Sequence, residues 1–172
     1  VYATGPIWRS TFWTSAAQKR IARDLAMLSD AAFVSSKGGY DQLQPMCPPC
    51  KLEISEVFSN VGEPATVRPL ADRSPHAVVF GGAARRMQVY RALLMAGEDI
   101  TSAFREFSVT RIFDIGPRVD VPPNVAGCPI QVCGPLTAGT VSDLLSDARM
   151  GILDYRRDKI TKSGIAAAYF SH

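Results

Sequence analysis

Histidine is scarce in this sequence, and long apolar runs are missing. With only His76 and His172 present, no Ser-His-Asp or Cys-His catalytic set can be assembled. We expect His76, which follows Pro75, to lie at the surface. The apolar runs fall far short of the ~20 residues that cross a bilayer, so we expect no transmembrane segment. Neither a G-x-G-x-x-G fingerprint nor a G-x-x-x-x-G-K-[ST] phosphate loop occurs, so the best-defined nucleotide motifs are absent too.

A strong charge of one sign is also missing. The net charge is +3, and the basic residues are scattered in pairs such as Lys19-Arg20, Arg85-Arg86 and Arg156-Arg157. A nucleic-acid interface needs a basic stripe or patch, so we expect no nucleic-acid partner, whereas paired cations suit a local phosphate site. The 47% apolar and 20% charged content is typical of a globular chain. Its 172 residues suffice for one core, or for one domain and part of another.

The four cysteines do not form a zinc-ribbon pattern. Cys47 and Cys50 have C-x-x-C spacing, but Cys128 and Cys133 follow much later than the ~15–20 residues expected of a zinc ribbon. We therefore expect no metal and no cofactor, and a proline-stiffened turn at Cys47–Cys50. A redox dithiol at this pair remains an alternative. Nothing demands a disulfide, so a reducing cytoplasm is the expected location.

Apolar periodicity predicts an α/β protein. A capped helix to about residue 28, a strand at 31–34, a short helix at 40–43 and a strand at 52–58 come first. After a polar, proline-rich stretch, strands and helices alternate: strands at 76–80, 110–115, 130–133 and 150–153, and helices at 85–96, 100–107, 138–147 and from 165. This alternation indicates a parallel sheet covered on both faces. The expected divisions are residues 1–62, a linker over 63–75, and a domain over 76–172.

The exits of the predicted strands are the candidate site, because parallel sheets bind ligands at the carboxyl ends of their strands. Backbone N–H groups, a hydroxyl and cations in these exits would suit a diphosphate. The residues chosen for it are Gly81, Gly82, Arg85, Arg86, Lys162, Ser163 and Gly164, with Gly116, Asp154 and Tyr155 as further contacts. The alternative is structural: turn glycines, a helix cap at Ser163 and arginines that coat an exposed helix face. The last predicted helix has no stop signal before His172 and no initiator methionine precedes Val1, so we expect a piece of a longer chain.

Several segments, in order, resemble the middle of a GT-B glycosyltransferase of the large "group 1" family. Residues 29–36 resemble its "ADAVIAVS" strand, and 57–62 its "VIPNGVD" domain crossing. Residues 77–82 are similar to "LFVGR", 111–117 to "LVIVGDGP", and 130–154 to "VRFLGYV…ELAALYAAADVFVLPS". The resemblance implies two facing Rossmann-like domains. Residues 1–62 would be the end of the N-terminal, acceptor-side domain, and 76–172 a truncated donor-binding domain.

The resemblance also implies sugar transfer from a nucleotide-sugar, which is the substrate, to an unknown acceptor. Two departures stand against it: Gly82 replaces the family's common arginine, and its E-x7-E glutamates align near Ile160 and Ala168. We expect the piece alone to be inactive, and peripheral membrane association is open for the whole protein. A non-catalytic Rossmann-like module for nucleotide binding or assembly, with self-association through exposed strand edges, is the alternative function. A thiol-redox protein using Cys47 and Cys50 is the third.

Overall fold

The computed structural model describes residues 12–47 and 51–172, and the chain divides into two compact units. Unit 1 comprises residues 1–57 and 158–162, and unit 2 comprises residues 58–157 and 163–172. The chain thus enters unit 2 after Val57, returns to unit 1 at Asp158 and leaves it again at Ser163. Each unit is described separately below.

Unit 1 combines helices with a short two-stranded sheet. Its elements are α1 (Phe12–Leu28), β1 (Ala32–Val34), α2 (Lys37–Leu43), η2 (Gln44–Met46), β2 (Leu52–Ile54) and most of η5 (Arg157–Lys162). Strands β1 and β2 pair in parallel, with Ala32 opposite Leu52. Ser36 caps α2 by accepting a hydrogen bond from the backbone N–H of Gly39 at 3.2 Å. The hydroxyl of Thr161 donates to the carbonyl of Ser35 at 2.7 Å, which ties η5 to the end of β1.

Unit 2 is built on a five-stranded mixed sheet in the order β5-β6-β4-β3-β7. The strands are β3 (Ser74–Phe80), β4 (Arg111–Ile115), β5 (Asn124–Val125), β6 (Cys128–Gly134) and β7 (Ala148–Gly151). Strands β6, β4, β3 and β7 run parallel, and β5 pairs antiparallel with β6. All four parallel strands therefore end at the same edge of the sheet.

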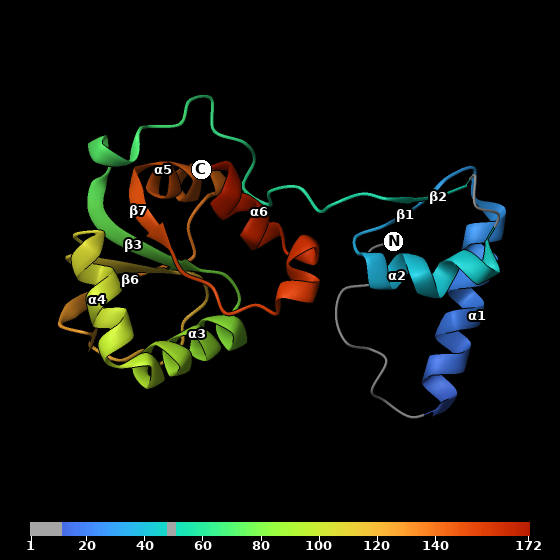
Figure 1. Cartoon of the computed structure of the whole chain (residues 1–172), viewed down its shortest axis with the longest axis horizontal. Coiled ribbons are helices and arrows are strands. Elements are labelled where there is room, and N and C mark those ends of the chain that lie inside the picture. Colours follow the sequence, from blue (N-terminus) through green and yellow to red (C-terminus); the bar gives the residue numbers. More distant parts are fainter. Residues whose placement is uncertain (1–11, 48–50) are drawn as a thin grey trace. The chain divides into compact units, whose positions relative to one another are not determined.

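Helices cover both faces of this sheet (Figure 1). On one face, α3 (Ala83–Ala96) and α4 (Glu98–Glu106) pack with Ala77, Val79 and Ile112 in one apolar cluster. On the other face, α5 (Ala138–Asp147) and α6 (Gly164–Ser171) pack around Val78 and Ile115. Successive β3 side chains thus enter opposite cores, which explains why this strand is apolar without alternation.

The α/β class and the predicted helices and strands of unit 2 are confirmed, with three differences. The sheet is mixed because β5, which was not predicted, runs antiparallel. The expected linker, residues 63–75, lies within unit 2 and contains η4 (Leu70–Asp72). There Arg73 donates to the carbonyls of Ala148 (3.1 Å) and His172 (2.5 Å). The surface position expected for His76 is wrong: it is 4% exposed, and its Nε2 lies 3.2 Å from the Leu144 carbonyl oxygen.

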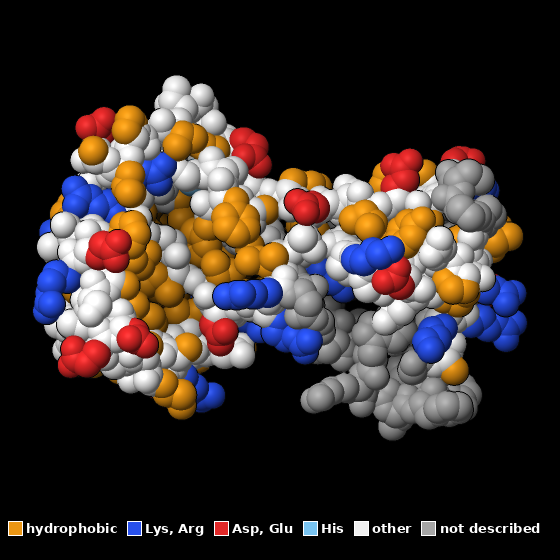
Figure 2. All heavy atoms as spheres, viewed as in Figure 1, with side chains coloured by type: hydrophobic (Ala, Val, Ile, Leu, Met, Phe, Trp, Pro, Cys, Tyr) orange, Lys and Arg blue, Asp and Glu red, His pale blue; other side chains and the backbone are white. Residues whose placement is uncertain are grey.

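The surface carries both signs of charge. On the face shown in Figure 2, Lys and Arg side chains are interspersed with Asp and Glu. Among the helices that the structure describes, none is long and apolar enough to span a membrane.

Candidate functional site

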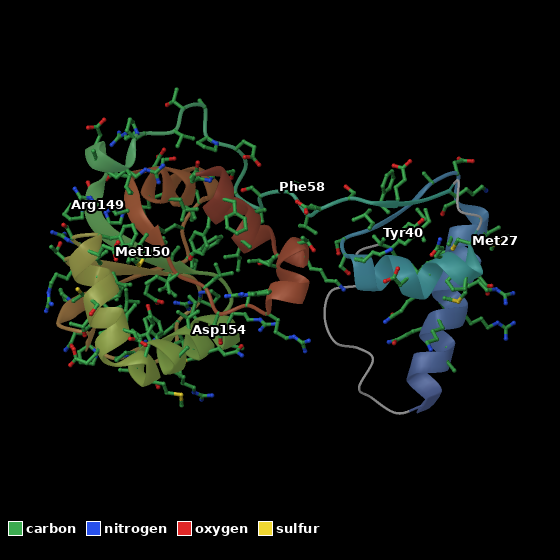
Figure 3. All side chains as sticks on the ribbon, in the orientation of Figure 1. Met27, Tyr40, Phe58, Arg149, Met150 and Asp154 are labelled. Carbon is green, nitrogen blue, oxygen red and sulfur yellow. The ribbon has the colours of Figure 1, made fainter. Side chains whose placement is uncertain are left out.

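The site is defined here as the carboxyl edge of unit 2, meaning the exits of β3 (Gly81–Gly82), β4 (Gly116–Pro117) and β7 (residues 152–155). Strand β3 leads into α3 on one face, whereas the segment after β7 leads through η5 to α6 on the other face. The two adjacent strands therefore send their chains to opposite faces of the sheet. Parallel sheets bind ligands at such a split, because the diverging connections leave a crevice there. Asp154 lies on the segment that leaves β7 (Figure 3).

The exits of β3 and β4 approach each other so closely that both begin with glycine. Gly81 has φ +134° and Gly116 has φ +144°, conformations that side chains disfavour. A Cβ at Gly116 would lie 2.2 Å from the Gly81 carbonyl oxygen. The N–H of Gly81 also donates to the Ile115 carbonyl at 3.1 Å. These glycines are therefore required by the backbone contact between the two exits.

Arg86 holds the exits of β3 and β4 together from the buried side of the site. Its side chain is 1% exposed, its Nε donates to the Gly81 carbonyl at 3.0 Å, and its terminal nitrogens bind the Asp114 carboxylate and the Pro117 carbonyl. Tyr90 donates its hydroxyl to the other Asp114 oxygen at 2.8 Å. Burial, and secondarily the hydrogen bond to Asp114, raise the pKa of Tyr90 above its ordinary value, so it stays a donor.

Arg86 was predicted to contact a diphosphate or to coat an exposed helix face, and its burial corrects both interpretations. Asp114, which pairs with Arg86, lies on β4 next to β3 and is 0% exposed. This buried carboxylate fixes the position of the arginine side chain. A guanidinium directed at two backbone carbonyls and a carboxylate supports the exits from inside the protein. It does not present itself to a ligand in solvent.

Arg85, one position earlier, is exposed and points to the exit of β7. Its guanidinium carbon lies 5.2 Å from the centroid of the Tyr155 ring, and it donates to Gln88 Oε1 at 3.1 Å. Gly82 is the N-cap of α3 and offers no side-chain cap. The N–H groups of Arg85 and Arg86 both donate to the Gly82 carbonyl at 3.1 Å, so those of Ala83 and Ala84 are the ones left without an intrahelical acceptor at the positive end of the helix dipole. A cation, an aromatic ring and free N–H groups thus meet at the split.

Of the remaining predicted residues, Asp154 lies in the exit of β7, whereas Lys162, Ser163 and Gly164 lie elsewhere in the fold. Ser163 is buried and its Oγ accepts from the Ala166 N–H at 3.1 Å, so this hydroxyl caps α6. Gly164 packs closely, since a Cβ there would lie 3.3 Å from the Phe58 carbonyl oxygen. Lys162 belongs to unit 1, so its contribution to the site remains a prediction from sequence. Asp154 is half-buried beside Tyr155 in the chain.

Sequence reasoning missed two residues that shape the site, Asp114 and Tyr169. Asp114 is the only charged residue between Arg111 and Gly116, and a lone carboxylate in an apolar strand was the available signal. Tyr169 of α6 accepts the N–H of Phe80, the last residue of β3, at 3.1 Å. It left no such signal, since an aromatic residue within an apolar helix is ordinary core material.

The described residues hold no group of three or more His, Cys, Asp or Glu side chains placed to bind a metal ion. Cys47 is buried as a free thiol, whereas its predicted redox partner Cys50 lies outside the described residues.

Comparison with known proteins gives no assignment. No protein-family model matches the chain, and no curated protein sequence matches it either.

Proposed function

We propose that this chain is a piece of a nucleotide-sugar-dependent glycosyltransferase of GT-B type, and that unit 2 holds the donor's diphosphate at its carboxyl edge. The observation that carries the proposal is the split between β3 and β7. The first strand, β3, is central; the sheet grows through β4 and β6 on one side, then through β7 on the other. This order matches strands 3-2-1-4 of a Rossmann-like sheet, in which the ligand crevice lies at that reversal, and the match supports the proposal.

The groups at the edge suit a diphosphate. The N–H groups of Ala83 and Ala84 would donate from fixed positions, and Arg85 supplies an exposed positive charge within the same turn. Gly82 lets the ligand approach the backbone without meeting a side chain, because the space around it is open.

The same groups would assist sugar transfer. Cleavage of the donor bond leaves a nucleoside diphosphate whose negative charge grows in the transition state. Prepositioned N–H groups and a guanidinium stabilise that growing charge without reorganising. Unit 1 would belong to the acceptor side, and we expect the 172-residue chain alone to bind nucleotide only weakly and not to transfer sugar.

Calorimetric titration of the chain with UDP and with GDP tests the site. Replacing Arg85 by alanine should weaken binding about tenfold or more, because a charge-assisted contact contributes ~1.5–3 kcal/mol. Arg91→Ala is the matched control, since Arg91 is an exposed arginine later on the same helix. No binding of either nucleotide, or equal affinity in the two variants, would contradict the proposal.

A non-catalytic nucleotide-binding module is the second candidate, and Ala168 favours it. Where the family often carries a glutamate, this chain aligns near an alanine that is 0% exposed in the core. Nucleotide binding without sugar transfer by the longer parent protein would support this alternative over the first.

A further inference from the structure

Tyr169 lies where β3 and β7 separate. The last backbone hydrogen bond between these strands runs from the N–H of Ile152 to the carbonyl of Val78 at 2.9 Å. Beyond it, the next N–H of β3 that faces β7 belongs to Phe80 and donates to the Tyr169 hydroxyl at 3.1 Å. The same hydroxyl lies 3.1 Å from the Val78 carbonyl oxygen and 3.2 Å from that of Ile152. A phenol from α6 therefore replaces the missing strand partner at the split.

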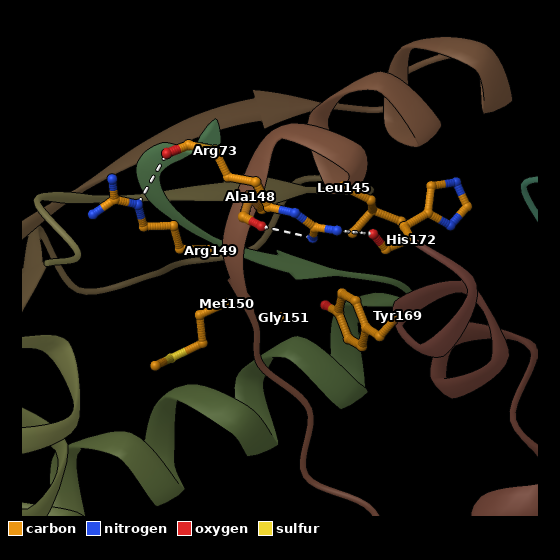
Figure 4. Close-up of a pocket in the computed structure, with 8 residues that line it drawn as sticks. All are labelled: Arg73, Leu145, Ala148, Arg149, Met150, Gly151, Tyr169 and His172. Carbon is orange, nitrogen blue, oxygen red and sulfur yellow. Dashed lines mark hydrogen bonds between the residues drawn. The ribbon is translucent and has the colours of Figure 1, made fainter. Parts of the chain in front are cut away.

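Gly151 of β7 leaves the space in which the Tyr169 ring packs against this strand. A Cβ at Gly151 would lie 2.5 Å from the Tyr169 Cδ1, so only glycine admits the ring in this position. Figure 4 shows the ring reaching from α6 toward Gly151. One turn earlier, Ile165 of α6 contacts the exit of β3, since its Cδ1 lies 2.5 Å from where a Cβ of Gly81 would be. One face of α6 thus contacts both exits, as residues four apart on a helix can.

Burial raises the pKa of Tyr169, so the phenol stays protonated and can donate while it accepts. With its single hydrogen it donates to one of the two carbonyls and accepts the N–H of Phe80. Its removal would leave that N–H without an acceptor. The peptide of Phe80 leads directly into Gly81–Gly82, and Gly82 starts α3. A loosened Phe80 peptide would therefore shift the N–H groups at the start of α3.

We infer that Tyr169 is a positioning residue for the anion site: its hydroxyl fixes the spacing of the β3 and β7 exits and thereby sets diphosphate affinity without touching the ligand. This role rests on the proposed function. Helix α6 would then position the site as well as pack against the sheet. Tyr169 lies on the opposite face of the sheet from Arg86.

Tyr169→Phe in the full chain tests the role, because it keeps the ring and removes only the oxygen. Amide exchange at Phe80, followed by NMR, should accelerate about tenfold, and UDP or GDP affinity in calorimetry should fall about tenfold. These are the changes expected when one buried donor loses its acceptor. Val125→Ala is the matched control for lost stability, since Val125 is 2% exposed in β5, at the opposite side of the sheet. Its affinity should stay within about twofold of the wild type, a shift too small to report a lost contact.

Gly151→Ala is the second variant if Tyr169→Phe folds poorly, since it displaces the ring while retaining the hydroxyl. It should weaken binding in the same direction. Wild-type affinity in both variants, or unchanged exchange at Phe80 in Tyr169→Phe, overturns the inference while leaving the proposed function standing. A wild-type chain that binds neither UDP nor GDP overturns both.

Discussion

Replacing Arg86 by methionine should destabilise unit 2 strongly, because it leaves the Asp114 carboxylate buried without its cation. Asp114 is 0% exposed and would retain only the hydroxyl of Tyr90. Removing one member of a buried ion pair costs about 3–5 kcal/mol, mostly through the charge left behind. A domain of this size is stable by about 5–15 kcal/mol, so the variant should fold but be marginal.

The double-mutant cycle separates this electrostatic effect from lost packing. We expect Asp114→Asn alone to cost about 3 kcal/mol, since it strands the Arg86 charge while its amide oxygen can still accept from Tyr90. In the Arg86→Met background the same change removes an uncompensated charge and should cost almost nothing. The double variant should therefore be about 3 kcal/mol more stable than additivity predicts.

Hydrogen exchange of β3 and β4 peptides, measured by mass spectrometry, is the suitable assay. Both tryptophans precede residue 14 and so lie within unit 1, which leaves tryptophan fluorescence without a probe in unit 2. Amides in the central strands exchange through global opening and report the stability of that unit. Arg85→Met controls for loss of an exposed arginine on α3 and should stay within about 0.5 kcal/mol of wild type. Additive single-variant costs would refute the view that Arg86 and Asp114 act as one buried pair.

Two further variants test the exits and the acid response. Gly116→Ala should cost about 1–3 kcal/mol or more, because its φ is +144° and its new methyl would meet a backbone oxygen. Gly82→Ala, with an ordinary φ of −66° and open space, should cost far less in urea denaturation. Hydrogen bonding to Ser74, and secondarily Arg68, lowers the pKa of Asp147, so its stabilisation is complete above the unfolded-state pKa of ~3.9 and is lost as pH falls through the folded value. Asp147→Asn should therefore reduce stability by about 0.5–1 kcal/mol at pH 7 and by less at pH 3; equal differences at both would exclude this linkage.

The elements of unit 2 could be predicted because each carries a local signal. Apolar runs end at glycine after β3 and β4. Thr137 caps α5 by accepting from the Thr140 N–H, and threonine is a common residue at this position before a helix. Strand β5 escaped prediction because its turn to β6 runs through Ala126 and Gly127, both with positive φ. The usual sequence signal for such a turn is Asn-Gly or Asp-Gly, which is absent here.

The site was harder to predict, because its geometry depends on partners far apart in sequence. Adjacent arginines on one helix turn look alike in sequence, yet Arg85 is exposed at Tyr155 and Arg86 is buried at Asp114. Helical periodicity shows that adjacent residues point to different sides of the helix. It does not show which of the two arginines meets a carboxylate on β4. Ser163 could be recognised equally as a cap or as a ligand group, and its bond to the Ala166 N–H gives it the first role.

Arg86 and Tyr169, one reassigned and one missed, together explain how the exit of β3 would serve as a rigid element in the proposed diphosphate site. Arg86 holds it to the exit of β4 from the face of α3, and Tyr169 holds it to β7 from the face of α6. Neither anchor binds a backbone N–H at the start of α3, so the N–H groups of Ala83 and Ala84 remain available for a ligand. A donor array fixed before binding loses little conformational entropy when the ligand arrives, and affinity rises accordingly. The glycines that make the exits accessible would otherwise make them loose, and the two buried anchors counter that freedom.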